Sequence, residues 1–153
     1  MKIGIADTTF ARVNMAEFAI DVIKKNSKHE IERYTVPGFK DLPVACLRLF
    51  EDCNCDIVMA FGMAGAAPVD QQCAHEASTS IQNVELKTKK HIIEVFVHMT
   101  ESEDDKEIFE IAKNRAEKHA LNTLELLKGK TALTSYAGQG RRQGKENEGS
   151  IKT

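Results

Sequence analysis

Short apolar runs alternate with amphipathic stretches along the 153-residue chain, and this alternation restricts its fold more than any other feature. The apolar runs predict four strands, at residues 2–6, 31–36, 56–61 and 91–97. Each strand is followed by a stretch whose apolar residues stand three and four positions apart, as in a helix that covers a core. Strands that are apolar along their length are typical of parallel sheets covered on both faces. With right-handed crossovers, the simplest fold is an α/β, flavodoxin-like three-layer sandwich with strand order 2-1-3-4.

Composition excludes several classes of partner. The chain has 21 Lys and Arg against 23 Asp and Glu, so no overall positive field favours nucleic acid or an anionic membrane surface. No apolar run has the ~18–20 residues that span a bilayer, and the chain begins without a signal-peptide pattern, which predicts a cytoplasmic protein. We expect one folded domain at residues 1–130, followed by a mobile polar tail at residues 131–153.

The cysteines and histidines show no metal-binding motif. Cys53 and Cys55 are too close in sequence for the usual zinc spacing, and no second pair accompanies them. The five histidines are scattered. Without an export signal, we expect the four cysteines to be free thiols.

Ligands of open parallel sheets bind beyond the carboxyl ends of the strands. Four segments of this chain follow strands and carry suitable groups. The predicted substrate-binding residues in them are Thr8, Thr9, Phe10, Pro37, Gly38, Phe39, Lys40, Asp41, Met63, Ala64 and Gly65. Glycine-rich segments present backbone N–H groups, and the aromatic rings suit a flat heterocycle. A capped turn with a core phenylalanine explains residues 8–10 equally well, and helix capping alone would explain Asp41.

Two residues of the fourth predicted strand are candidates for proton transfer. Glu94 interrupts an apolar run, and an unpaired buried carboxylate costs several kcal/mol, so it must lie at an edge, in a pair, or against a ligand. His98 ends the strand and can titrate near neutral pH. A capping or packed histidine remains an equally good interpretation.

Residues 36–43, Val-Pro-Gly-Phe-Lys-Asp-Leu-Pro, resemble the Val-Pro-Gly-Ala-Phe-Glu-(Ile/Leu)-Pro signature of lumazine synthases. Other similarities follow in the same order: Thr9-Phe10, the glycine segment 62–67, His75-Glu76-Ala77, and Arg115-Ala116. The similarity covers residues 2–128. The chain lacks that family's Thr-His pair after the third strand and has Glu94 near the position of an aromatic residue. This pattern is similar to the archaeal-type riboflavin synthases, which are paralogues of lumazine synthase.

The resemblance implies a transferase that dismutates two molecules of 6,7-dimethyl-8-ribityllumazine to riboflavin and 5-amino-6-(D-ribitylamino)uracil by transfer of a four-carbon unit. It implies a homopentamer whose sites lie between adjacent subunits, each holding two lumazines, with Arg115 at the substrate. No organic cofactor is expected, and the resemblance implies a divalent cation such as Mg²⁺. His98 or Glu94 would handle protons, with His119 as a further catalytic candidate.

Three alternatives stay open. The first is lumazine synthase itself, which condenses 5-amino-6-ribitylaminouracil with 3,4-dihydroxy-2-butanone 4-phosphate. The others are a non-catalytic lumazine- or flavin-binding protein and a flavodoxin-like interaction module.

Overall fold

The computed structural model describes all 153 residues and contains one four-stranded parallel sheet in the order β2-β1-β3-β4. The predicted fold class and strand order are therefore confirmed. The strands are β1 (Lys2–Thr8), β2 (Glu30–Val36), β3 (Ile57–Ala64) and β4 (Ile92–His98). The helices are α1 (Met15–Asn26), α2 (Leu42–Glu51), α3 (Pro68–Thr88) and α4 (Asp105–Lys128), with short 3₁₀ turns η1 (Phe39–Asp41), η2 (Met99–Glu101) and η3 (Thr134–Tyr136).

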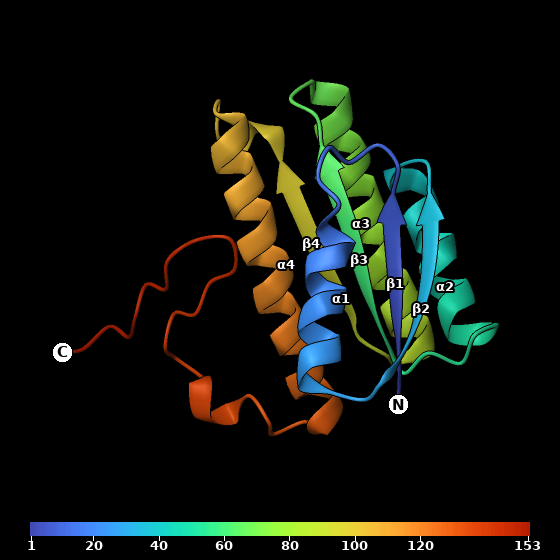
Figure 1. Ribbon diagram of the computed structural model, residues 1–153, viewed down its shortest axis with the longest axis vertical. Coiled ribbons are helices and arrows are strands. Elements are labelled where there is room, and N and C mark those ends of the chain that lie inside the picture. Colours follow the sequence, from blue (N-terminus) through green and yellow to red (C-terminus); the bar gives the residue numbers. More distant parts are fainter.

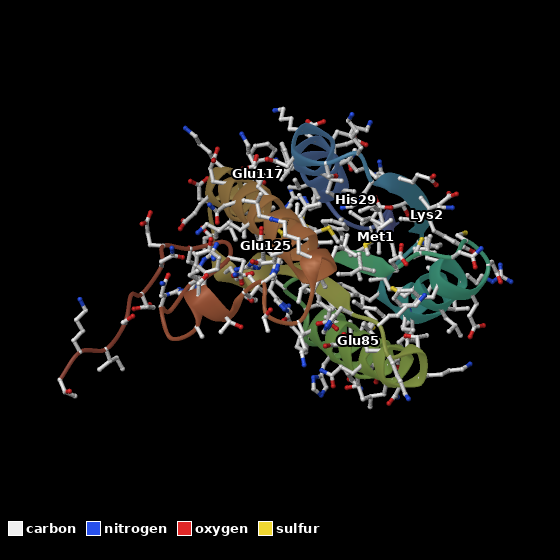
Figure 2. The ribbon with its side chains drawn as sticks, turned by 90° about the horizontal axis from the view of Figure 1, so that it is seen from below. Met1, Lys2, His29, Glu85, Glu117 and Glu125 are labelled. Atoms are coloured by element: carbon white, nitrogen blue, oxygen red, sulfur yellow. The ribbon has the colours of Figure 1, made fainter.

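Helices cover the sheet in pairs, and the sheet forms the middle of three layers. Helices α1 and α4 lie on one face, and α2 and α3 lie on the other, as the view along the strands shows (Figure 2). Each face has its own core. Ile3, Ile5 and Met59 point toward α1 and α4, whereas Ala6, Val58 and Ala60 point toward α2 and α3. This alternation follows from the two-residue period of a strand.

The third strand is longer than predicted. Residues Gly62, Met63 and Ala64, which we expected in a glycine-rich loop, continue β3 and pair with Phe96, Val97 and His98 of β4. Helix capping, the alternative interpretation of Asp41, is not observed. Asp41 stands at the N-cap position of α2 and Asn14 at that of α1, but neither side chain forms a capping hydrogen bond.

Residues after α4 run back along that helix (Figure 1). The Nζ of Lys118 donates to the carbonyls of Arg142 and Lys145, and Asn114 Oδ1 accepts from the N–H of Gly144. The C-terminal segment is therefore packed on α4 through polar contacts. No helix in the structure has the length and apolar character required to cross a bilayer.

Candidate functional site

The loops that follow the four strands all lie at one end of the sheet, at the top in Figure 1. The first two loops are joined by hydrogen bonds. The N–H of Thr9 donates to the Val36 carbonyl at 2.9 Å, and the N–H of Phe10 donates to the Pro37 carbonyl at 3.1 Å. These contacts extend the β1–β2 pairing beyond the strands and hold Phe10 beside the segment 37–41.

A cavity of about 220 Å³ opens between these loops and the start of α3. The structure brings five of the predicted binding residues together here: Phe10, Gly38, Phe39, Lys40 and Asp41. Two lining residues, Asp70 and Cys73, were missed by the sequence analysis. They belong to the first two turns of the helix that follows β3, and the start of a helix after a parallel strand lies at the ligand end of the sheet.

The two aromatic residues of the cavity differ in exposure. Phe10 is 52% exposed, whereas Phe39 is only 6% exposed and packs edge-to-face on Phe96 with 4.9 Å between ring centroids. Phe39 also covers Gly62, where a Cβ atom would lie 2.3 Å from the phenylalanine Cε1. Phe39 is thus a fixed part of the cavity wall, and Phe10 offers an open ring face for a planar ligand.

Charged groups rim the same cavity. Lys40 Nζ lies 3.2 Å from Glu76 Oε2, and this hydrogen bond raises the pKa of Lys40 and lowers that of Glu76. The exposed Asp41 carboxylate makes no capping bond. It can therefore accept hydrogen bonds from ligand hydroxyls.

Thr8 and Thr9 line a different cavity, of about 440 Å³, together with Asp7, Arg33 and Thr35. Thr8 Oγ1 accepts from the N–H of Ala11, as in the turn that was the alternative interpretation of this segment. Asp7 is bound by Arg33 Nη2 and Thr35 Oγ1, both at 2.6 Å. The 220 Å³ cavity and this one are thus separate in the single chain.

Met63 and Ala64 were predicted to present backbone groups in a loop, but both are buried residues of β3. Gly65 follows the strand and lies so close to Asp70 that a Cβ would stand 2.3 Å from Asp70 Oδ2. The glycines at positions 62 and 65 therefore permit close packing of Phe39 and Asp70.

His98 and Glu94 lie on β4, which is an edge strand. His98 Nδ1 is 2.6 Å from Gln71 Oε1, and the His98 backbone N–H donates to Glu101 Oε2. Glu94 Oε2 accepts from Ser78 Oγ at 2.9 Å, while its Oε1 is buried without a partner. Burial raises the pKa of Glu94, and this outweighs the opposite effect of the Ser78 hydrogen bond. Glu94 is therefore at an edge, as one interpretation required, but it has no ion-pair partner.

Arg115 is held by groups of the chain itself. Its guanidinium binds both carboxylate oxygens of Glu101 at 2.8 Å, the Phe96 carbonyl at 2.9 Å and the Gln143 carbonyl at 3.2 Å. Glu101 stands in an acidic run of the sequence, yet its side chain is only 18% exposed. Its burial alone would raise the pKa, but the hydrogen bonds and charge of Arg115 hold the pKa below its ordinary value.

His119 lies away from the strand ends. It lines a third cavity of about 580 Å³, between α4 and the C-terminal segment, together with Ile93 and Tyr136. Ile93 is near the start of β4, five residues before His98, which corresponds to about 16 Å along a strand. Burial, with a smaller effect of the Arg115 charge, lowers the pKa of His119 to about 4. The structure does not place His119 with the other candidates.

Comparison with known proteins agrees with this architecture. Residues 1–131 match the family model described as 6,7-dimethyl-8-ribityllumazine synthase. A riboflavin synthase from Methanothermobacter thermautotrophicus is 49% identical over 152 residues, which is 99% of each chain. Riboflavin synthases from Archaeoglobus fulgidus and Aeropyrum pernix are 45% and 41% identical, over 99% and 98% of this chain and 99% and 97% of their own. With this match and this full-length similarity, the chain belongs to the 6,7-dimethyl-8-ribityllumazine synthase family.

Proposed function

We propose that this chain is a riboflavin synthase, a transferase of riboflavin biosynthesis. The observation that carries the proposal is the 41–49% identity, over nearly the whole chain, to archaeal proteins with that name. The reaction would convert two molecules of 6,7-dimethyl-8-ribityllumazine to riboflavin and 5-amino-6-(D-ribitylamino)uracil.

The cavity at the strand ends supports a substrate of this kind. Phe10 supplies an exposed aromatic face for the bicyclic ring, and Lys40 and Asp41 supply charged partners for ribityl hydroxyls. The 7-methyl proton of the lumazine is acidic because the ring system delocalises the resulting charge. Catalysis therefore depends mainly on holding two substrates in attack geometry, where effective molarities reach ~10⁵–10⁸ M.

We further propose that the site is completed by a second copy of the chain, in a homopentamer. The 220 Å³ cavity is smaller than the ~300–1,000 Å³ of ordinary ligand sites, and two bicyclic ring systems need more room than one. The side chains of Phe10, Val44 and Val69 are each at least half exposed near this end of the molecule. A second copy placed against this end would cover exposed apolar side chains of this kind. A cytoplasmic location remains part of the proposal.

We propose His98 as the group that accepts the 7-methyl proton, because it ends β4 at the ligand end of the sheet. Glu94 stands four residues earlier, about 13 Å away along the strand, and is a weaker candidate.

Asp41 and Asp70 line one cavity and offer oxygen ligands of the type that Mg²⁺ prefers. Substrate oxygens would have to complete such a site, because no cluster of three ligating side chains exists in the chain.

The Glu101–Arg115 pair argues against lumazine synthase, the second candidate. That reaction requires a phosphorylated four-carbon substrate, and Arg115 is already neutralised by a carboxylate.

The two functions are separated by incubating the purified protein with the lumazine alone. We expect riboflavin and the uracil product in equal amounts. Product formed only from the uracil and the butanone phosphate would establish the alternative, and stoichiometric lumazine binding without turnover would establish a storage protein.

A further inference from the structure

Gln71 connects the carboxyl ends of β3 and β4. Its Nε2 donates to the carbonyl of Gly65 at 2.7 Å, and its Oε1 lies 2.6 Å from His98 Nδ1. A peptide carbonyl can only accept, so the amide nitrogen of Gln71 must face Gly65. The amide oxygen must then face the histidine ring.

The orientation of this amide determines which ring nitrogen of His98 carries the proton. An amide oxygen is an acceptor, so Nδ1 must donate, and in a neutral imidazole the lone pair is then on Nε2. We propose that Gln71 is a positioning residue that holds His98 in the Nδ1–H tautomer and so makes Nε2 the basic atom.

A second contact competes for the same ring. His98 and Glu101 form a capping box, in which the backbone N–H of Glu101 faces the His98 side chain and the Glu101 carboxylate accepts from the His98 N–H. The Glu101 N–H nevertheless forms no capping hydrogen bond with the ring, and such a bond at Nδ1 would require the opposite tautomer. Two acceptors at 2.6 Å would repel, so the Gln71 contact is incompatible with an unprotonated Nδ1. The structure therefore favours Gln71 over the capping contact.

The position of Gln71 links the tautomer to the cavity. Asp70 and Cys73, on either side of it in sequence, line the 220 Å³ cavity, whereas Gln71 faces β4. One helical turn thus forms part of the ligand cavity and also orients the candidate base. The use of Nε2 as the base for the lumazine 7-methyl proton rests on the proposed function, but the tautomer does not.

A neutron crystal structure of the full assembly, grown at a pD well above the ordinary pKa of histidine near 6.5, tests the tautomer directly. We expect a deuteron on Nδ1 of His98 and none on Nε2. A deuteron on Nε2 would overturn the proposal whatever the activity of the protein. If wild-type protein makes no riboflavin, the proposed function fails while the tautomer assignment can still stand.

Kinetics of two variants test the role of the tautomer. Gln71→Leu removes the acceptor that keeps the proton on Nδ1, so we expect kcat to fall by about 10- to 100-fold with KM within twofold. Gln71→Glu keeps an acceptor for Nδ1–H but loses the donor to the Gly65 carbonyl, so we expect it to recover kcat only in part. The matched control is Gln72→Leu, because the Gln72 side chain is exposed and bonds only to Glu76. An unchanged kcat in Gln71→Leu, or a fall of the same size in Gln72→Leu, would contradict the positioning role.

Discussion

At the scale of single residues, the most informative pair is Glu101 with Arg115. The two side chains are 18% and 13% exposed and share two hydrogen bonds at 2.8 Å. Arg115 also donates to carbonyls of β4 and of the C-terminal segment, so the pair fixes the end of the edge strand next to His98.

Replacing Glu101 by Gln should lower the free energy of unfolding by about 2–3 kcal/mol, because the Arg115 charge stays largely buried without a counter-charge. Urea unfolding measures the change, with the exposed Glu103→Gln as control. The pKa of Glu101 is lowered in the folded protein. The charged Glu101 therefore stabilises the folded protein fully above pH 4.5, the ordinary pKa of the group. This stabilisation is lost as the pH falls through the pKa of Glu101 in the folded protein. An acid-unfolding profile identical in wild type and Glu101→Gln would show that the pair does not act in this way.

His119 should contribute a pH dependence of the same sign, beginning at a higher pH. Its pKa of about 4 lies below the ordinary 6.5, so the unfolded chain takes up a proton first as the pH falls from 6.5 to 4. The protein then loses up to about 3 kcal/mol of stability over this interval. His119→Gln should remove most of this loss in unfolding measured at several pH values, and the exposed His91→Gln should retain it. If the stability of His119→Gln still falls as steeply between pH 6.5 and pH 4, groups other than His119 cause the loss.

At the scale of elements, the end of β3 depends on the absence of a side chain at position 62. A Cβ there would lie 2.3 Å from Phe39, whose ring is already packed on Phe96. Gly62→Ala should destabilise the protein by about 1–3 kcal/mol and raise the KM for the lumazine, because Phe39 must move into the cavity. Gly38→Ala is the stability control, since nothing lies within 4 Å of its Cβ position and its backbone is extended. Equal unfolding midpoints for the two variants would contradict this prediction.

The C-terminal segment depends on Gly144 in a similar way. Its φ is +86°, and a Cβ would lie 2.5 Å from Arg115 Nη2. Gly144→Ala should detach the segment from α4 and make residues 131–153 more susceptible to proteases. Gly138→Ala carries the same conformational strain, with a φ of +78°, but meets no atom within 4 Å. Similar cleavage rates in both variants would show that strain alone, rather than contact with Arg115, decides the docking.

The strand order and the Phe10–Asp41 cavity could be predicted because they follow from local patterns and from a general rule about parallel sheets. Three features could not. Gly62-Met63-Ala64 has the composition of a loop, and only pairing with β4 makes it a strand. Glu101 stands in an acidic run that is typical of a solvated helix start, yet Arg115, fourteen residues later, pairs with it. Gln71 has no recognisable pattern, since its role depends on two partners six and twenty-seven residues away.

At the scale of the whole molecule, several features of the single chain support the proposal that a second copy completes the site. Strands β2 and β4 leave both edges of the sheet unpaired, and Glu94 Oε1 is buried beside one of these edges without a partner. The cavity is small, and the open ring face of Phe10 has no cover within the chain. A second copy placed against this end would cover exposed apolar groups and enlarge the cavity together.

A crystal structure with an unreactive analogue of 6,7-dimethyl-8-ribityllumazine tests this account most directly. We predict that each site holds two stacked analogue molecules, one of them against Phe10 and Phe39. We also predict that the end of β4 from a neighbouring protomer closes the other side of the site. One analogue bound within a single protomer, with no second copy of the chain in contact with it, would contradict the account.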